Sequence, residues 1–233
     1  MTNVQGFARL RLVALNIDGV LLNDTFSPVI HRYLTTRGAA YTADVERTVF
    51  SQPQKIAGER MADVLGDGRS GPQALAEYFE ERDAYLKEHP VTVQPGAVEL
   101  LTRLRGLGLR TVCYGGLAKD HFDRFLGAHA ALFDDPGYVC TDAVRPGLRE
   151  ITDLFSLRHG QVLFVDDVAR VAEAARNDGL PFIGFPTPFE HSFQAHLMKE
   201  AGVRHRIHSL DDITEELLLA VDDETAAGTL WEA

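Results

Sequence analysis

The chain has 233 residues, which is enough for one large domain or for a core with a smaller insert. Its content of 45% hydrophobic and 24% charged residues is ordinary for a soluble globular protein. The net charge of −11 argues against nucleic acid or an anionic membrane as a partner, because both bind basic surfaces.

The sequence shows no apolar stretch typical of a signal peptide or of a membrane-spanning helix. Its two cysteines, Cys113 and Cys140, lie in apolar runs, and no His or Cys cluster has zinc-ligand spacing. We therefore expect buried, reduced thiols and a cytoplasmic location.

The first predicted element is a strand at residues 10–17 (LRLVALNI), which is followed by Asp18 and Gly19. An almost unbroken apolar run of this length favours a strand that is buried on both faces, as in a parallel sheet.

Residues 23–94 carry no strand pattern and indicate a small, all-helical insert. Four stretches within it look helical: 27–36, 42–50, 54–65 and 72–87. The segment 93–96 (VQPG) marks the return to the rest of the chain.

Strand and helix patterns alternate after the insert. Strands are predicted at 110–114, 161–165, 181–185 and 205–208, with a weaker one at 138–141, and helices at 97–107, 147–157, 169–177, 190–201 and 211–221. This alternation predicts an α/β fold with a Rossmann-like parallel sheet. We expect a core of residues 1–22 and 95–233, a helical cap of residues 23–94, and a loose acidic tail after Val221.

Small and polar residues follow the predicted strands. They are Asn16 and Asp18, then Gly115 and Gly116, then Arg145, and finally Asp166 and Asp167. Ligands of open parallel sheets bind at the carboxyl ends of the strands. Carboxylates there can move protons and hold Mg²⁺, and a fixed cation can hold phosphoryl oxygens.

In order and spacing, residues 12–221 resemble the haloacid dehalogenase superfamily, in particular its phosphoglycolate-phosphatase-like members with a helical cap. Residues 16–20 (NIDGV) are similar to motif I, Asp-x-Asp-Gly-Val/Thr, with Asn16 at the nucleophile position and Asp18 at the acid/base position. Arg145 and Pro146 resemble the Lys-Pro of motif III, and residues 165–167 (VDD) resemble motif IV. The resemblance implies a phosphorylated substrate and Mg²⁺ held by Asp18, Asp166 and Asp167, with Asp166 preferred over Asp167.

Four positions depart from that pattern. Asn16 replaces the nucleophile, Gly115 replaces a Ser or Thr of motif II, Arg145 replaces Lys, and Val171 falls where a further Asp or Asn often stands. A neutral amide is a poor nucleophile, so we expect no covalent phospho-intermediate and weakened Mg²⁺ binding. Gly115, Gly116 and Arg145 remain candidates for contacts with the ligand.

Three interpretations follow. The first is a divergent or pseudo-phosphatase that binds a phosphorylated or anionic small molecule between core and cap, or that uses Asp18 as acid/base in another reaction. The second is a genuine Mg²⁺-dependent phosphomonoesterase with a mutated nucleophile. The third is an interaction protein with a vestigial site. The number of departures favours the first, and each is compatible with a protein partner or a homodimer.

Each candidate residue also has a purely structural interpretation. Asp18 could be a turn residue, Asp166 and Asp167 could cap a helix, and Arg145 could form a surface ion pair.

Overall fold

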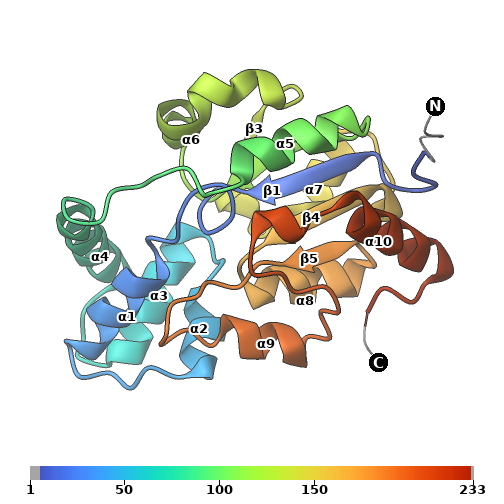
Figure 1. Ribbon diagram of the computed structural model, residues 1–233. Coiled ribbons are helices and arrows are strands. Elements are labelled where there is room, and N and C mark those ends of the chain that lie inside the picture. Colours follow the sequence, from blue (N-terminus) through green and yellow to red (C-terminus); the bar gives the residue numbers. More distant parts are fainter. Residues whose placement is uncertain (1–5, 232–233) are drawn as a thin grey trace.

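A five-stranded parallel sheet runs through the middle of the molecule in the order β3-β2-β1-β4-β5 (Figure 1). The computed structural model describes residues 6–231. The strands are β1 (Leu12–Asn16), β2 (Arg110–Gly115), β3 (Tyr138–Cys140), β4 (Val162–Asp166) and β5 (Phe182–Gly184). The α/β fold with a Rossmann-like parallel sheet is therefore confirmed.

Strand β1 is central because every one of its five residues is buried. Side chains alternate between the two faces of a strand, so Ala14 packs in one hydrophobic cluster and Leu15 in the other. The register places Asn16 opposite Tyr114 of β2 and Leu15 opposite Val165 of β4. The carboxyl ends of the three central strands therefore lie at the same edge.

Six helices follow the strands and cover the two faces of the sheet (Figure 1). Helices α7 (Leu148–Leu154), α8 (Ala169–Asp178) and α9 (Gln194–Glu200) contribute to the cluster that contains Ala14. Helices α5 (Ala97–Gly106), α6 (Lys119–Leu126) and α10 (Glu215–Ala227) contribute to the cluster that contains Leu15. The result is a sheet between two helical layers.

The remaining helices gather beyond the tip of β1 (Figure 1). They are α1 (Ser27–Thr35), α2 (Ala43–Val49), α3 (Gln54–Leu65) and α4 (Gly71–Tyr85). The chain leaves and re-enters the sheet region at one place, because Leu22 forms an antiparallel bridge with Val93 and the Gln94 amide donates to the Leu21 carbonyl at 2.9 Å.

The structure corrects some of the predicted elements. Residues 205–208 form no strand but a single bridge, in which Arg206 pairs with Gly184. The tail after Val221 is not loose over its whole length, since α10 continues to Ala227 and Trp231 stacks on Phe182 at 6.1 Å. Helix α6 was not expected at all.

Of the two cysteines, Cys113 is buried as expected, whereas Cys140 at the sheet edge is exposed. None of the helices within residues 6–231 has the length and apolar character needed to cross a membrane.

Candidate functional site

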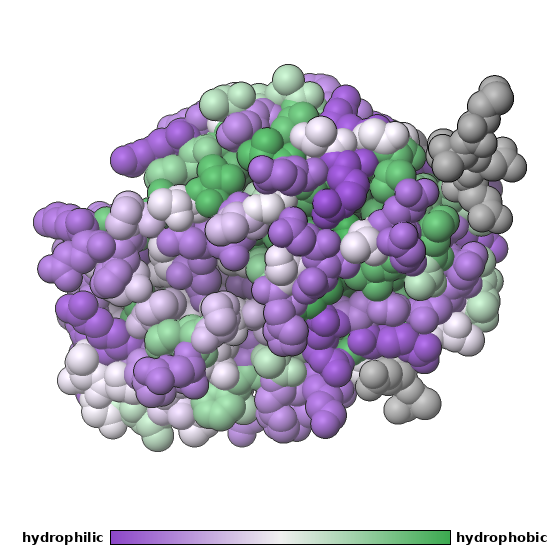
Figure 2. All heavy atoms as spheres, in the orientation of Figure 1, coloured by the Kyte–Doolittle hydropathy of each residue, from purple (hydrophilic) through white to green (hydrophobic). Residues whose placement is uncertain are grey.

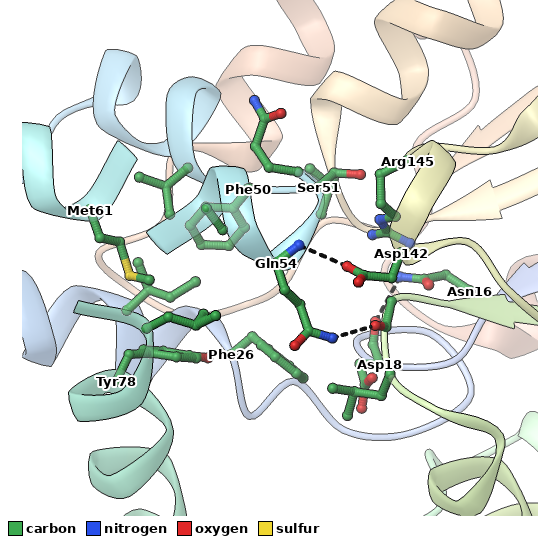
Figure 3. A pocket seen from close by; sticks show the side chains of 18 of the residues that line it. Asn16, Asp18, Phe26, Phe50, Ser51, Gln54, Met61, Tyr78, Asp142 and Arg145 are labelled. Carbon is green, nitrogen blue, oxygen red and sulfur yellow. Dashed lines mark hydrogen bonds between the residues drawn. The ribbon is translucent and has the colours of Figure 1, made fainter. Parts of the chain in front are cut away.

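A pocket of about 130 Å³ lies between the carboxyl edge of the sheet and helices α1–α4 (Figure 3). Its polar lining comes from both sides: Asn16, Asp18, Asp142, Arg145 and Asp167 at the sheet edge, and Asp24, Ser51, Gln52, Gln54 and Tyr78 on the helical insert. Most of its apolar lining comes from the insert, namely Phe26, Ile30, Val49, Phe50, Ala57, Met61, Leu75 and Phe79, and Leu117 and Val168 of the core complete it. The apolar surface thus lies mainly on the insert side.

Asn16 ends β1, and its side chain is held by two acceptors. Its Nδ2 donates to the Asp18 carbonyl and to Asp167 Oδ1, each at 2.9 Å. Because both partners are acceptors, the NH₂ end of the amide must face them. The neutral amide of Asn16 therefore donates a hydrogen bond to the Asp167 carboxyl group.

The loop after Asn16 closes tightly on Asp167. Gly19 has a φ of +86°, and a Cβ at this position would lie 2.2 Å from Asp167 Oδ2. Only glycine combines this backbone conformation with this close approach.

Asp18, on the same loop, places Oδ1 2.9 Å from Nε2 of His121, which belongs to α6. His121 was not predicted as a site residue. A signal was present in the sequence, because Phe122, Phe125 and Leu126 have the spacing of an amphipathic helix.

Asp166 and Asp167 differ in whether they line the pocket. Asp166 accepts hydrogen bonds from the Tyr114 hydroxyl at 2.5 Å and from the Val168 amide at 2.9 Å, and it does not line the pocket. Asp167 does line it. The geometry thus favours Asp167 over Asp166 as the residue that faces a ligand, the reverse of the preference that the sequence suggested.

Both carboxyl groups are buried, and burial raises their pKa values. For Asp167 the neighbouring Asp166 adds to the effect of burial, which places its pKa well above the usual range.

Gly115 and Gly116 also differ in whether they line the pocket. A Cβ on Gly115 would lie 2.5 Å from Ile17 Cγ2 and 3.1 Å from the Tyr138 hydroxyl, so the space for a side chain is already filled. Gly115 does not line the pocket, whereas Gly116 does. The Gly116 carbonyl accepts a hydrogen bond from Gln54 Nε2 at 2.9 Å.

Arg145 lines the pocket, and it is the one cationic side chain among the described lining residues. Its Nη1 donates to the Thr141 hydroxyl at 3.2 Å, and its positive charge lowers the pKa of Asp166 against the effect of burial. The remaining guanidinium donors are available to a ligand.

The insert reaches the polar residues of the sheet edge at the start of α3. The Gln54 amide donates to Asp142 Oδ1 at 2.7 Å, which places that carboxylate at the positive end of the helix (Figure 3). Gln54 therefore binds two core loops, one through its backbone and one through its side chain.

Ser51, between α2 and α3, is another residue of the pocket that was not predicted from the sequence. Its φ of +52° is unusual for a residue other than glycine and costs about 1 kcal/mol. Its hydroxyl is buried without a partner, and in Figure 3 it points toward the side of the pocket where Arg145 lies.

The side chains as arranged do not fit Mg²⁺. This ion prefers oxygen ligands, but Asn16 turns its NH₂ group to Asp167, and Asp166 is engaged by Tyr114 and Val168. Within the part of the chain that the structure describes, no three His, Cys, Asp or Glu side chains gather closely enough to hold a metal ion.

No protein-family model matches the chain, and none of the curated proteins matches it. Solved structures do. A conserved haloacid dehalogenase-like protein from Agrobacterium tumefaciens superposes with a TM-score of 0.66 at 21% identity, covering 92% of this chain and 100% of its own. A phosphonoacetaldehyde hydrolase-like protein from Oleispira antarctica gives 0.68 at 15% identity, covering 98% of both chains.

A predicted phosphoglycolate phosphatase from Haemophilus somnus gives a TM-score of 0.62 at 16% identity, covering 89% of this chain and 98% of its own. At these identities the likeness establishes a haloacid dehalogenase-like fold and nothing finer.

Proposed function

We propose that this protein binds a small phosphorylated or otherwise anionic molecule in the pocket, and that it forms no aspartyl-phosphate on it. The observation that carries the proposal is the state of Asn16. Its amide stands at the tip of the central strand, where the fold's phosphatases use a carboxylate, and is engaged by Asp18 and Asp167. A neutral amide in that state does not attack phosphorus.

Arg145 supports the anionic class of ligand. The acidic residues beside it have partners within the protein, because Asp142 accepts from the start of α3, Asp18 faces His121, and Asp167 accepts from Asn16. The guanidinium is then the charged group with open donors, and it can hold two oxygens of a phosphoryl group or carboxylate.

Ser51 gives further support for an anionic ligand. A hydroxyl is missing at Gly115, where packing by Ile17 and Tyr138 leaves no room for one. The unpaired Ser51 hydroxyl can supply a donor from the opposite wall of the pocket. Backbone strain held at a pocket residue is typical of functional sites.

In this proposal residues 23–94 act as a cap that closes the pocket, residues 1–22 and 95–233 act as the core, and Mg²⁺ has no part. The interpretation as an interaction protein has less support. In Figure 2 the visible face over α1–α4 is mainly hydrophilic, and within residues 6–231 only Val144 and Leu154 are large exposed hydrophobic side chains.

The test uses propylphosphonate, whose phosphorus–carbon bond is not hydrolysed, in isothermal titration calorimetry. We expect saturable binding to the unchanged protein. Arg145→Gln should weaken that binding about 10- to 100-fold, the loss expected for a hydrogen-bonded charge. The matched control is Arg60→Gln on α3, where the side chain is exposed and outside the pocket.

Binding that Arg145→Gln leaves unchanged would contradict the proposed anion site. Preferential binding of propylammonium would contradict it as well, because it would show that the acidic residues dominate the pocket.

A further inference from the structure

We infer that the pocket has a second recognition point, formed by Tyr78 and Asp24, that receives a hydroxyl group of the ligand. The inference rests on the proposed function, since the ligand's anionic end is taken to bind at Arg145. It adds the chemistry of the opposite end, which faces the helical insert.

Besides Ser51, two residues that line the pocket carry a buried polar atom without a partner. The Tyr78 hydroxyl is one, in a residue of α4 that is only 3% exposed. The other is Asp24 Oδ2, and both residues line the pocket. Leaving such groups unpaired is costly, so each one in a folded protein calls for an explanation.

Local structure does not use these atoms. Asp24 binds the start of α1 through its other oxygen, because Oδ1 accepts from the Phe26 amide at 2.9 Å and from the Ser27 amide at 3.0 Å. In Figure 3 the Tyr78 hydroxyl points from α4 toward Phe26 and the middle of the pocket.

Both groups face the same pocket, and no hydrogen bond joins them. Burial raises the pKa of the Tyr78 phenol, Arg82 opposes the rise, and the negative charge of Asp24 adds to it. Each group can therefore still form a hydrogen bond with a ligand in the pocket.

The donor and acceptor inventory selects that group. A phenol hydroxyl can donate, and a carboxylate oxygen can only accept. A ligand hydroxyl accepts from Tyr78 and donates to Asp24, which satisfies both. An ammonium group cannot accept from Tyr78, and Arg82, whose guanidinium lies 4.2 Å from the Phe26 ring, further disfavours a cation.

The apolar wall between the two recognition points determines the chemistry of the middle part of the ligand. Phe50, Met61, Leu75 and Phe79 line it and favour a short hydrocarbon segment. The expected ligand is therefore a small molecule with a phosphoryl or carboxylate group at one end, an apolar middle, and a hydroxyl at the other end.

Calorimetry with four sets of probes tests this assignment. Alkylphosphonates and their ω-hydroxy and ω-amino counterparts, each with three to six carbons, are compared with the matching neutral diols. At the best chain length we expect the hydroxyalkylphosphonate to bind about 3- to 10-fold more tightly than the alkylphosphonate, the value of one hydrogen bond.

Variants separate the role of the hydroxyl from packing. Tyr78→Phe removes only the phenol oxygen and should abolish this preference while leaving alkylphosphonate binding unchanged. Asp24→Asn keeps the oxygen that binds α1 and should weaken only the hydroxyalkyl series. The control is Tyr85→Phe, on the same helix but outside the pocket.

Because the Tyr78 hydroxyl has no partner, the ligand-free Tyr78→Phe protein should melt at the same temperature as the unchanged protein or higher. A fall in that temperature would show that the hydroxyl is used by the fold, and would overturn the inference.

The binding outcomes distinguish this inference from the proposed function. Equal affinity for alkyl and hydroxyalkyl phosphonates, with dependence on Arg145, overturns the inference and leaves the proposed function standing. A preference for the aminoalkyl series overturns the hydroxyl assignment. Tyr78-dependent binding of the diols without binding of any phosphonate supports the inference and contradicts the anion site, and no binding at all overturns both.

Discussion

Asn16 offers hydrogens to two acceptors that would otherwise face each other across the tip of the central strand. Its Nδ2 lies 2.9 Å from Asp167 Oδ1 and 2.9 Å from the Asp18 carbonyl. In sites built from carboxylates a cation commonly fills that role. The amide fulfils it without a metal ion, because its two N–H groups donate to both acceptors.

Asn16→Asp should therefore destabilise the protein when chelator is present, because two carboxyl groups would be forced together. We expect a loss of about 1–3 kcal/mol, with partial recovery on adding Mg²⁺. Thermal melts with EDTA and with Mg²⁺ measure both effects.

The matched control is Asn177→Asp, the same chemical change at an exposed position, which should shift stability by less than about 0.5 kcal/mol. A melting temperature of Asn16→Asp equal to that of the unchanged protein in EDTA would argue against the role given to the amide.

Gly115→Ser tests whether position 115 has room for a side chain that carries a hydroxyl. The new Cβ would lie 2.5 Å from Ile17 Cγ2 in the core, so we expect a loss of about 1–3 kcal/mol in urea unfolding. Gly127→Ser is the control, because a Cβ there meets no atom within 4 Å.

If Gly115→Ser were as stable as its control, the packing would not exclude a hydroxyl, and a phosphatase with a single mutated nucleophile would regain support.

At the scale of elements, most predicted strands and helices are present, including short ones such as β3 and β5, and α6 and the strand at 205–208 are exceptions. The buried run at β1 and the helix at α3 match the structure because length and pattern agree. Helix α6 was missed because it spans only eight residues and begins with Lys119 and Asp120. The strand at 205–208 failed because it reaches the sheet edge through one bridge.

Part of the candidate site could be predicted from the sequence, and part of it could not. Asn16, Asp18, Arg145 and Asp167 could be placed together from the sequence, because each follows a strand of one sheet. The contacts that depend on how the insert meets the core could not be predicted. They join residues far apart in sequence, as when Gln54 binds Asp142, and no local pattern encodes such pairs.

Helix α2 meets the core through Glu46, a fully buried residue. Its carboxylate accepts from the Tyr41 hydroxyl at 2.8 Å, from the Ser192 hydroxyl at 3.3 Å and from Gln194 Nε2 at 2.8 Å. Burial nevertheless raises the pKa of Glu46 above its usual 4.5, with these hydrogen bonds opposing the rise.

The sign of the pH dependence follows. The folded protein holds the Glu46 proton more tightly than the unfolded chain, so this group's contribution to stability is fully present below pH 4.5 and is lost as the pH rises through the raised value. Glu46→Gln has no ionisable group at this position, so its stability does not fall as the pH rises through that value. Relative to the unchanged protein, it should gain stability between pH 4.5 and pH 8, as measured by urea unfolding.

Glu46→Ala should instead destabilise the fold by about 1–3 kcal/mol at both pH values, because Tyr41 and Gln194 lose their partner. A pH profile of Glu46→Gln that runs parallel to that of the unchanged protein would contradict the assignment.

At the scale of the whole molecule, the helical insert is bound to the core at two places. Gln54 of α3 binds the loops at Asp142 and Gly116, and Arg47 of α2 pairs with Glu173 of α8 at 3.3 Å and Glu200 of α9 at 2.9 Å. These contacts hold the insert over the tip of β1, where the pocket lies. The arrangement suits recognition of a small molecule.

The most direct test of this account is hydrolysis of p-nitrophenyl phosphate by the unchanged protein in the presence of Mg²⁺, followed as release of p-nitrophenolate. We predict release at the rate of the uncatalysed control at all protein concentrations, in the same preparation that binds propylphosphonate. Saturable release at many turnovers per protein molecule, abolished by EDTA, would contradict the claim that Asn16 disables covalent capture of phosphate.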